Sequence, residues 1–269
     1  MIRLPQPHLP VIALSDCGRQ RRNNEDRFRV CALADPRAPE APVLLAILAD
    51  GMGGHQAGEV AAELAVTMVE AFVLEHGDSL SPPSLLFEAL RHASQVIYEQ
   101  AQRNPDQTGM GATCACAWIQ KGRLYIANVG DSRVYLIRRG QPQRLSVDHT
   151  WVQEALDNGW ITREEALHHP QAHMIRQFLG SATPPEVDLR LRLSAQESDL
   201  QARANQGLHL NPGDFVLLCS DGLSDLVNDE EMAHLLNLHP MEQAAKILVD
   251  LANQRGGHDN ITLILIGIP

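Results

Sequence analysis

The apolar residues of this chain fall into short continuous runs and into stripes at helical spacing. Residues 43–49 are apolar at every position, which predicts a strand that is buried on both faces. Asp50 and Gly51 follow this strand, further glycines form a turn, and a helix is expected to begin near Ala57. A carboxylate beside a glycine turn suits a cation or a phosphate, although Asp-Gly is also an ordinary turn dipeptide.

The N-terminal half of the chain predicts strands followed by a pair of helices. Residues 1–10 are expected to be a loose lead-in, followed by strands at Val11–Cys17 and Phe28–Leu33. A proline-rich loop is expected at Asp35–Pro42, before the apolar run. Two amphipathic helices come after that run, and their apolar stripes are Val60, Ala61, Leu64, Met68 and Phe72, then Leu86, Leu90, Ala93 and Ile97.

The C-terminal half begins with three strands whose short connecting turns predict an antiparallel meander. These strands are Ala112–Ile119, Arg123–Val129 and Ser132–Arg138. Residues 150–180 are polar and rich in histidine, and we expect them to form a mostly helical flap outside the core. The remaining elements are strands near Val187–Leu193, Phe215–Cys219 and Ile261–Ile268, and helices at Asp229–Leu236 and Met241–Arg255.

This order of elements predicts an α+β fold in which two antiparallel sheets lie between two pairs of helices. Strands flank each helix pair, and layers of this kind allow every apolar face to be buried. No linker or internal repeat divides the chain, so we expect one domain over residues 11–269. Residues 194–207 are polar and are predicted to be an exposed loop or a short helix, inserted between strands.

Composition excludes several classes of function. The net charge of −11 argues against non-specific nucleic-acid binding, which needs clustered positive charge. The five cysteines are odd in number and have no zinc or redox spacing, which favours reduced thiols in a cytoplasmic protein. No apolar run approaches the ~18 residues of a membrane span, and the N-terminus does not have the pattern of a signal peptide.

Carboxylates recur where an apolar strand meets a loop. The five places are Glu25-Asp26, Asp50, Asp131, Asp221 and Asp259. One such aspartate is usually a turn former, but several close carboxylates repel one another unless a cation neutralises them. An oxygen-only donor set favours Mg²⁺ or Mn²⁺ over Zn²⁺, and two ions bridged by one carboxylate suit displacement at phosphorus.

The chain resembles the metal-dependent protein serine/threonine phosphatases of the PP2C (PPM) family, bacterial type. The resemblance covers the chain from about residue 11 to its end, in the order of the family's motifs. The matching segments are SDCGRQRRNNED (15–26), LADGMGGHQAGE (48–59), TGMGAT (108–113), ANVGDSRVYLI (127–137), DHT (148–150), ITREEALHHP (161–170), LNPGDFVLLCSDGLSD (210–225) and GGHDNIT (256–262).

The resemblance implies a four-layer αββα sandwich with a binuclear metal centre at the edge of the sheets. On the family's pattern, Asp50 bridges two ions, either Mn²⁺ or Mg²⁺, and the carbonyl of Gly51 coordinates the second. Asp221 and Asp259 match the ligands of the first ion.

Four further positions take roles from the same resemblance. Glu25 and Asp26 match residues that serve the second ion, directly or through its waters. Asp131 matches the residue that helps to bind a weaker third ion in bacterial members. Arg21 matches the arginine that binds the substrate phosphate, and residues 150–180 match the mobile flap.

The implied reaction is hydrolysis of phosphoserine and phosphothreonine on proteins, and it would reverse a bacterial Ser/Thr kinase. A water between two divalent ions becomes a hydroxide nucleophile near neutral pH and attacks phosphorus in line. Arg21 can bind two phosphate oxygens through its planar guanidinium. The implied partners are phosphoproteins and a cognate kinase, and we expect a monomer that binds neither nucleic acid nor membrane.

The proton donor for the leaving alkoxide has two candidates. Some members carry histidine directly after the Asp-Gly pair, but that position is Met52 here. His55 is the nearest histidine, and a metal-bound water is the alternative. A non-catalytic pseudophosphatase is the rival function, although such members usually lack an acidic ligand that this chain retains. An aspartyl-phosphate enzyme would need an Asp-x-Asp motif, which residues 50–52 do not supply.

The flap departs from the family at residues 173–176, where an Asn-containing stretch is common in bacterial members. Because the predicted donor set is oxygen, we expect the histidines near the flap to pack or to cap it rather than to bind metal. These histidines are His149, His168, His169 and His173. Asn260 is expected to orient the loop that carries Asp259.

Overall fold

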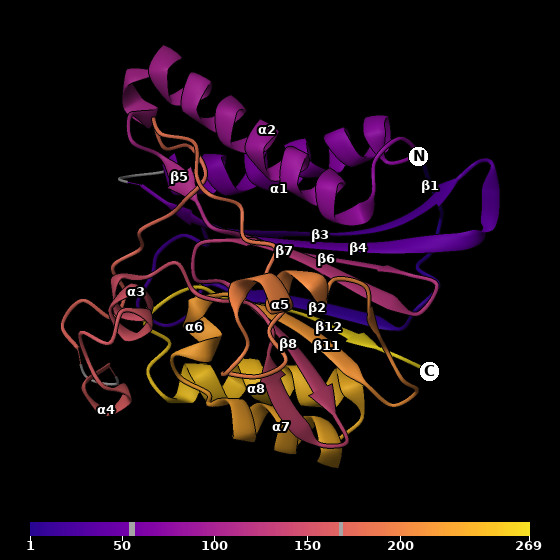
Figure 1. Cartoon of the computed structure of the whole chain (residues 1–269). Coiled ribbons are helices and arrows are strands. Elements are labelled where there is room, and N and C mark those ends of the chain that lie inside the picture. Colours follow the sequence, from indigo (N-terminus) through magenta and orange to yellow (C-terminus); the bar gives the residue numbers. More distant parts are fainter. Residues whose placement is uncertain (54–56, 167–168) are drawn as a thin grey trace.

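The computed structural model describes residues 1–53, 57–166 and 169–269, in which two antiparallel sheets pack between two layers of helices (Figure 1). In spatial order, the first sheet contains β1 (Ile2–Arg3), β3 (Asp26–Asp35), β4 (Ala38–Met52), β6 (Cys114–Gln120), β7 (Arg123–Val129) and β10 (Leu208–His209), with β5 (Gly111–Ala112) beside β4. The second sheet contains β2 (Val11–Asp16), β12 (Ile261–Gly267), β11 (Phe215–Cys219), β8 (Arg133–Arg138) and β9 (Gln141–Arg144). The predicted α+β sandwich is confirmed.

Two pairs of long helices form the outer layers. Helices α1 (Ala57–His76) and α2 (Pro82–Arg103) cover the first sheet, and α7 (Asp229–Leu238) and α8 (Met241–Gln254) cover the second. The shorter helices lie in connections: a 3₁₀ turn (Pro105–Gln107), α3 (Trp151–Asp157), α4 (Arg163–Ala166), α5 (Asp199–Ala204) and α6 (Asp221–Ser224). Among the described residues, no helix has the length and apolar character to cross a membrane.

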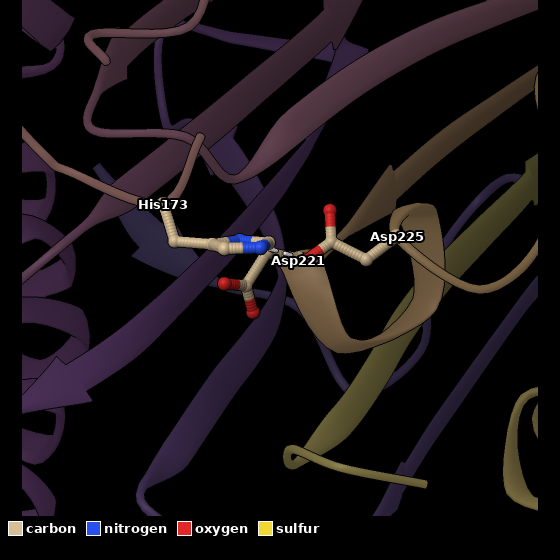
Figure 2. A group of neighbouring side chains, drawn as sticks. All are labelled: His173, Asp221 and Asp225. Atoms are coloured by element: carbon tan, nitrogen blue, oxygen red, sulfur yellow. Dashed lines mark ion pairs between the residues drawn. The ribbon is translucent and has the colours of Figure 1, made fainter. Parts of the chain in front are cut away.

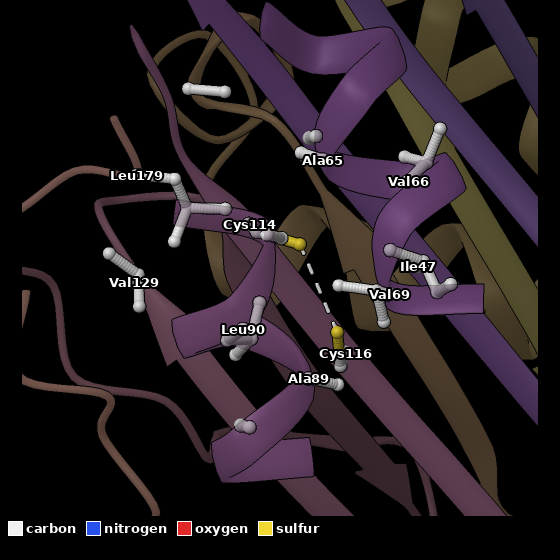
Figure 3. Packing of buried hydrophobic residues seen from close by; sticks show 14 of the residues in the cluster. Ile47, Ala65, Val66, Val69, Ala89, Leu90, Cys114, Cys116, Val129 and Leu179 are labelled. Carbon is white, nitrogen blue, oxygen red and sulfur yellow. Dashed lines mark hydrogen bonds between the residues drawn. The ribbon is translucent and has the colours of Figure 1, made fainter. Parts of the chain in front are cut away.

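Strand β4 supplies side chains to two hydrophobic cores because successive strand residues point to opposite faces. Leu45 and Ile47 pack under α1 and α2, whereas Leu44 and Leu48 pack between the two sheets. Figure 3 shows the helix side of this strand, where Ile47 lies near Val69. The prediction that residues 43–49 are buried on both faces is confirmed.

The cysteines behave as the sequence predicts. All five are free, and the four in or beside apolar runs are buried. Cys114 and Cys116 point into the core beneath the first helix pair, with their sulfur atoms 3.9 Å apart (Figure 3). These side chains therefore serve as small core residues.

The predicted three-strand meander is wrong at its third strand. β6 pairs with β7, but β8 pairs with β9 and β11 in the other sheet. The turn at residues 130–132 therefore connects the two sheets. Gly130 has φ +102°, and a Cβ there would lie 2.6 Å from the Thr113 side chain, so glycine is required. Redirection of the chain at this glycine prevents a hairpin.

Three other local predictions are also wrong. Asp35–Pro42 is not a loop, because β3 and β4 form a hairpin that closes with Asp35 opposite Ala38. Residues 187–193 form no strand and pair through the single bridge between Asp188 and Asn128. Within the described part of the flap, only α3 and α4 are helical, so that segment is mostly irregular. In the lead-in, Ile2 and Arg3 pair with β3.

Candidate metal centre and active site

The register of two central strands places two aspartates directly opposite each other. Asp26 begins β3 and pairs with Asp50 near the end of β4. Side chains at opposed positions share one face and have Cβ atoms about 5 Å apart, so like charges there destabilise the pair. Asp26 is buried, and its Oδ2 accepts a 2.7 Å hydrogen bond from Ser220 Oγ, but its Oδ1 has no partner among the described residues.

The second sheet brings two more aspartates to the same edge. Asp221 begins α6 two residues after β11, and Asp259 lies two residues before β12. β11 and β12 are antiparallel neighbours, so the end of one strand lies beside the start of the other. A Cβ on Gly222 would lie 2.0 Å from the Asn260 carbonyl oxygen, which means that only glycine allows these two loops to approach.

Asp131 reaches this centre from the turn between the sheets. Its side chain is buried, and Oδ1 has no hydrogen-bond partner in the described ranges. The neighbouring Ser132 shares a 2.7 Å hydrogen bond with the hydroxyl of Thr113. The same hydroxyl accepts a hydrogen bond from the backbone N–H of Asp50. These two hydrogen bonds hold the turn at residues 130–132 against the end of β4.

The carboxyl groups of this centre are protonated more readily than ordinary aspartates. Burial and the repulsion of neighbouring carboxylates raise the pKa of Asp26 to about 7 and that of Asp221 to about 6. The pKa values of Asp50 and Asp131 are raised well above the usual range for the same two reasons. The centre therefore concentrates carboxyl groups whose negative charge the described residues neutralise only in part.

These observations fit a site for hard divalent cations. Within the described ranges, buried oxygens without hydrogen-bond partners occur on Asp26, Asp131 and Asp221. The donors are carboxylate oxygens, which Mg²⁺ and Mn²⁺ prefer, and a cation would lower each raised pKa. The group of predicted ligands thus comes together in space, although its residues come from both sheets.

Glu25 and Arg21 lie on the loop that enters β3. The Arg21 guanidinium donates a 2.6 Å hydrogen bond to Asp259, which raises the pKa of the arginine, and its side chain is 55% exposed. Burial raises the pKa of Glu25. Asn260 Oδ1 accepts a 2.7 Å hydrogen bond from the backbone N–H of Glu25, and its Nδ2 donates to the carbonyls of Cys17 and Asn23. Asn260 therefore ties this loop to the start of β12.

Gly51 lies where three backbone segments meet. A Cβ there would lie 2.1 Å from the carbonyl oxygen of Gly58 and 2.9 Å from that of Glu25. Any side chain would thus push the first turn of α1 away from β4. His55, the predicted proton donor, and the neighbouring Gly54 lie outside the described residues.

Sequence analysis missed Asp225, which also faces the centre. It follows Asp221 by four residues, a spacing that places both on one face of a helix. Its backbone N–H donates a 2.8 Å hydrogen bond to the Asp221 carbonyl, and its negative charge raises the pKa of Asp221. The signal was present in the segment SDGLSD, where a second aspartate follows the first by one helical turn.

The prediction for His173 is wrong, because this flap histidine does not pack within the flap. Its Nδ1 lies 3.2 Å from Asp225 Oδ2, and Figure 2 shows the ring directed toward Asp225 and Asp221. His149 and His169 do have packing roles: His149 Nδ1 accepts a hydrogen bond from the Gly130 N–H, and His169 stacks on a tryptophan ring. His168 lies outside the described residues.

A cleft of about 1440 Å³ leads away from the centre, between the flap and residues 190–199. Asp131, Asp221 and Asp225 lie at the end nearest the centre. Part of its lining is basic and comes from Arg133, Arg144, Arg190 and Arg192. Residues 194–207 contain α5, so the predicted short helix is confirmed.

Comparison with known proteins agrees with this geometry. Residues 17–254 match the family model described as protein phosphatase 2C. The chain is 34% identical over 256 residues to a serine/threonine phosphatase of Listeria welshimeri, covering 94% of this chain and 93% of that protein. The structure of the Streptococcus agalactiae serine/threonine phosphatase has 32% identity and a TM-score of 0.80, over 97% of this chain and 100% of that one.

A further solved structure contains metal. It is the catalytic domain of the serine/threonine protein phosphatase PstP in complex with two manganese ions. The two chains are 33% identical with a TM-score of 0.73, and the match covers 97% of this chain and 99% of that one.

Proposed function

Because the chain belongs to the protein phosphatase 2C family, we propose that it hydrolyses phosphoserine and phosphothreonine on proteins with two Mn²⁺ or Mg²⁺ ions. The observation that carries this proposal is the cluster of carboxylates with raised pKa values and buried, unpartnered oxygens. A cluster of buried carboxylates lowers the stability of the fold unless cations are bound. A purely structural role therefore explains this cluster poorly.

The proposed ligands of the two main ions come from three segments of the chain. Asp50, at the end of β4, bridges the two ions, and the Gly51 carbonyl coordinates the second. Asp221 and Asp259 bind the first ion from the edge of the other sheet. The geometry that supports these roles is the proximity of both strand ends and the close approach of backbone at Gly51.

Three further residues complete the proposed centre. Glu25 and Asp26 serve the second ion, directly or through water. Asp131, together with Asp221, binds a weaker third ion. The unpartnered Oδ1 of Asp26 and of Asp131 supports these assignments.

In the proposed mechanism the bound ions lower the pKa of an attacking water and neutralise the charge of the phosphate. Arg21 binds the phosphate through two N–H groups, since its exposed guanidinium already reaches the centre at Asp259. Asn260 fixes the loop of Arg21 and so orients the guanidinium relative to the carboxylates. His55 stays a prediction for the proton donor, and water is the alternative.

The proposed substrates are phosphoproteins, including a cognate Ser/Thr kinase and its targets. A monomeric state is part of the same proposal. The cleft beside the centre provides space for the polypeptide that flanks a phosphorylated residue.

The test is phosphate release from a phosphothreonine peptide by the purified chain. Turnover is expected with Mn²⁺ or Mg²⁺, and EDTA should abolish it. A matched phosphotyrosine peptide serves as the control for specificity. Turnover that survives complete removal of metal would contradict the proposal. Tight binding of the phosphopeptide without turnover at saturating Mn²⁺ would instead support a pseudophosphatase.

A further inference from the structure

A histidine of the flap and two aspartates, at the start of α6 and at its C-cap, form a compact group beside the proposed centre. One ligand atom from each of His173, Asp221 and Asp225 lies within 4.8 Å of the other two (Figure 2). The histidine belongs to the flap, whereas Asp221 begins α6, the helix that follows β11, and Asp225 is the C-cap residue of that helix. The group therefore joins two parts of the chain across the mouth of the cleft.

We propose that His173 is a metal ligand, and that the ion it shares with Asp221 and Asp225 fastens the flap across the cleft. This ion is the weaker third ion already proposed at Asp131 and Asp221, and it is distinct from the two ions at Asp50. The imidazole gives the site a preference for Mn²⁺ over Mg²⁺. The inference rests on the proposed function, because Asp221 also belongs to the proposed binuclear centre.

The spacing of the ligand atoms supports coordination. Two neighbouring ligands of an octahedral ion with ~2.1 Å bonds lie about 3 Å apart. His173 Nδ1 and Asp225 Oδ2 are 3.2 Å apart. Asp221 Oδ1 is buried without a hydrogen-bond partner among the described residues, so it can bind an ion without breaking an existing contact. Asp131 Oδ1, also buried and unpartnered, lines the same end of the cleft.

The chemistry of the donors supports the preference for manganese. Mg²⁺ binds oxygen almost exclusively, whereas imidazole is a good ligand for transition metals. Replacement of one oxygen donor by His173 therefore penalises Mg²⁺ more than Mn²⁺. The proposed inner centre has only oxygen donors and lacks this discrimination.

An ion pair between His173 and Asp225 is the competing explanation. His258 helps to separate the two, because its Nε2 also faces Asp225 Oδ2, at 3.8 Å. His258 comes from the loop before β12 rather than from the flap, and it is not part of the three-residue group. If only the charge of an imidazole near Asp225 mattered, removal of either histidine would have a similar effect on metal binding. If the histidine is a metal ligand, only removal of His173 should weaken metal binding.

The residues that directly follow His173 are already held by backbone hydrogen bonds to the start of the flap. The Trp151 N–H donates to the Met174 carbonyl, and Thr150 forms a β-bridge with Ile175. Coordination at His173 would add an anchor between these contacts and α4. Binding of the ion should therefore restrain residues 169–173 and reduce local opening of the flap at α4.

The first experiment measures metal binding directly, by titration calorimetry of EDTA-treated full chain. His173→Ala is expected to weaken the weakest Mn²⁺ site at least about tenfold and to change Mg²⁺ binding less than about twofold. His258→Ala should leave both affinities unchanged. His173→Asn restores an oxygen donor and should bind both ions with similar affinity. Unchanged Mn²⁺ binding in His173→Ala would overturn the inference, as would equal losses for both metals.

The second experiment follows the flap by limited trypsin digestion. In the wild type, Mn²⁺ is expected to slow cleavage after Arg163 by about fivefold, and Mg²⁺ is expected to slow it less. In His173→Ala, Mn²⁺ should not slow this cleavage. Cleavage after Arg103, which is exposed at the end of α2, provides an internal control. Equal protection in His173→Ala would overturn the inference. Wild-type phosphatase activity measured in parallel distinguishes failure of this inference from failure of the proposed function.

Discussion

Two groups of buried aspartates in this protein differ in the source of their counter-charge. The centre acids, Asp26, Asp50, Asp131 and Asp221, have raised pKa values. The arginine-paired acids, Asp148 and Asp188, have lowered pKa values. Because both groups include strongly buried members, burial by itself does not explain the difference.

The arginine-paired acids are neutralised within the folded chain. Asp148 lies 2.8 Å from Arg133 and 3.1 Å from Arg144. Asp188 accepts two hydrogen bonds from Arg190, and His149 lies nearby. Burial raises the pKa of Asp188, but these contacts outweigh it and lower the pKa to about 2.

The comparison shows that the chain can neutralise buried carboxylates and does so a short distance from the centre. Arg133, which pairs with Asp148, is only two residues from Asp131. At the centre itself, three carboxylates keep an oxygen without a hydrogen-bond partner among the described residues: those of Asp26, Asp131 and Asp221. A site that binds cations from solution needs this unneutralised charge.

The largest expected effect comes from removing one centre acid. Asp221→Asn should lower kcat/KM for a phosphothreonine peptide by at least about 10³-fold, because it removes a proposed ligand of the first ion. The fold should persist, as judged by circular dichroism. Asp250→Asn, a change at an exposed position of α8, is the control and should keep full activity. Full activity in Asp221→Asn would contradict the proposed centre.

Removal of an arginine-paired acid should act on stability instead. Asp188→Asn should lower the free energy of unfolding by about 2–3 kcal/mol at pH 7, from the shift of its pKa to about 2. A lowered carboxyl pKa stabilises the fold above the unfolded pKa near 4 and loses this effect as the pH falls through 2. Urea unfolding should therefore show that the free energy of unfolding differs between wild type and Asp188→Asn by about half as much at pH 3 as at pH 7.

The pH dependence of the metal-free protein should have the opposite sign. Asp26 and Asp221, with pKa values raised to about 7 and about 6, retain protons more strongly in the folded state. Stability is then greatest below pH ~4 for these groups, and it falls by several kcal/mol as the pH rises to 8. Urea unfolding in EDTA should show this decrease, and saturating Mn²⁺ should remove it. Stability of the metal-free protein that is independent of pH from 5 to 8 would contradict the difference between the two groups.

The smallest effect is expected from a conservative change of the arginine at the centre. Arg21→Lys should lower kcat/KM about tenfold, because an ammonium group cannot bind two phosphate oxygens in the planar geometry of a guanidinium. Arg22→Lys is the matched control, since Arg22 is the adjacent exposed arginine. Equal activities of the two variants would argue against phosphate binding by Arg21.

The parts of the fold and the centre that sequence could predict are those encoded locally. The apolar run 43–49 and the aspartate that follows it are contiguous, so a buried strand with a carboxylate at its end follows from the pattern. The long helices follow from their apolar residues as well. In α1, however, the fully buried face includes Ala65, Val69 and Val73, whereas most of the predicted stripe is only partly buried. The recurrence of aspartates at strand ends indicated a cation site before any geometry was known.

Features that depend on distant contacts could not be predicted. The transfer of β8 to the second sheet depends on the packing of Gly130 against Thr113. His173 reaches Asp225 only because the flap crosses the cleft, and these residues are 52 positions apart in the sequence. Strand-like alternation at residues 187–193 reflects apolar side chains that pack on the sheets without forming a ladder.

The burial of β4 on both faces also has a consequence for dynamics. This strand is hydrogen-bonded to β3 on one side and to β6 on the other, and its central side chains are inaccessible to solvent. Amide hydrogens in such a strand exchange only when the whole domain opens. Asp50 therefore lies at the end of a slowly exchanging segment, whereas His173 lies in an exposed flap. A displacement of the flap would thus leave in place the carboxylate proposed to bridge the ions.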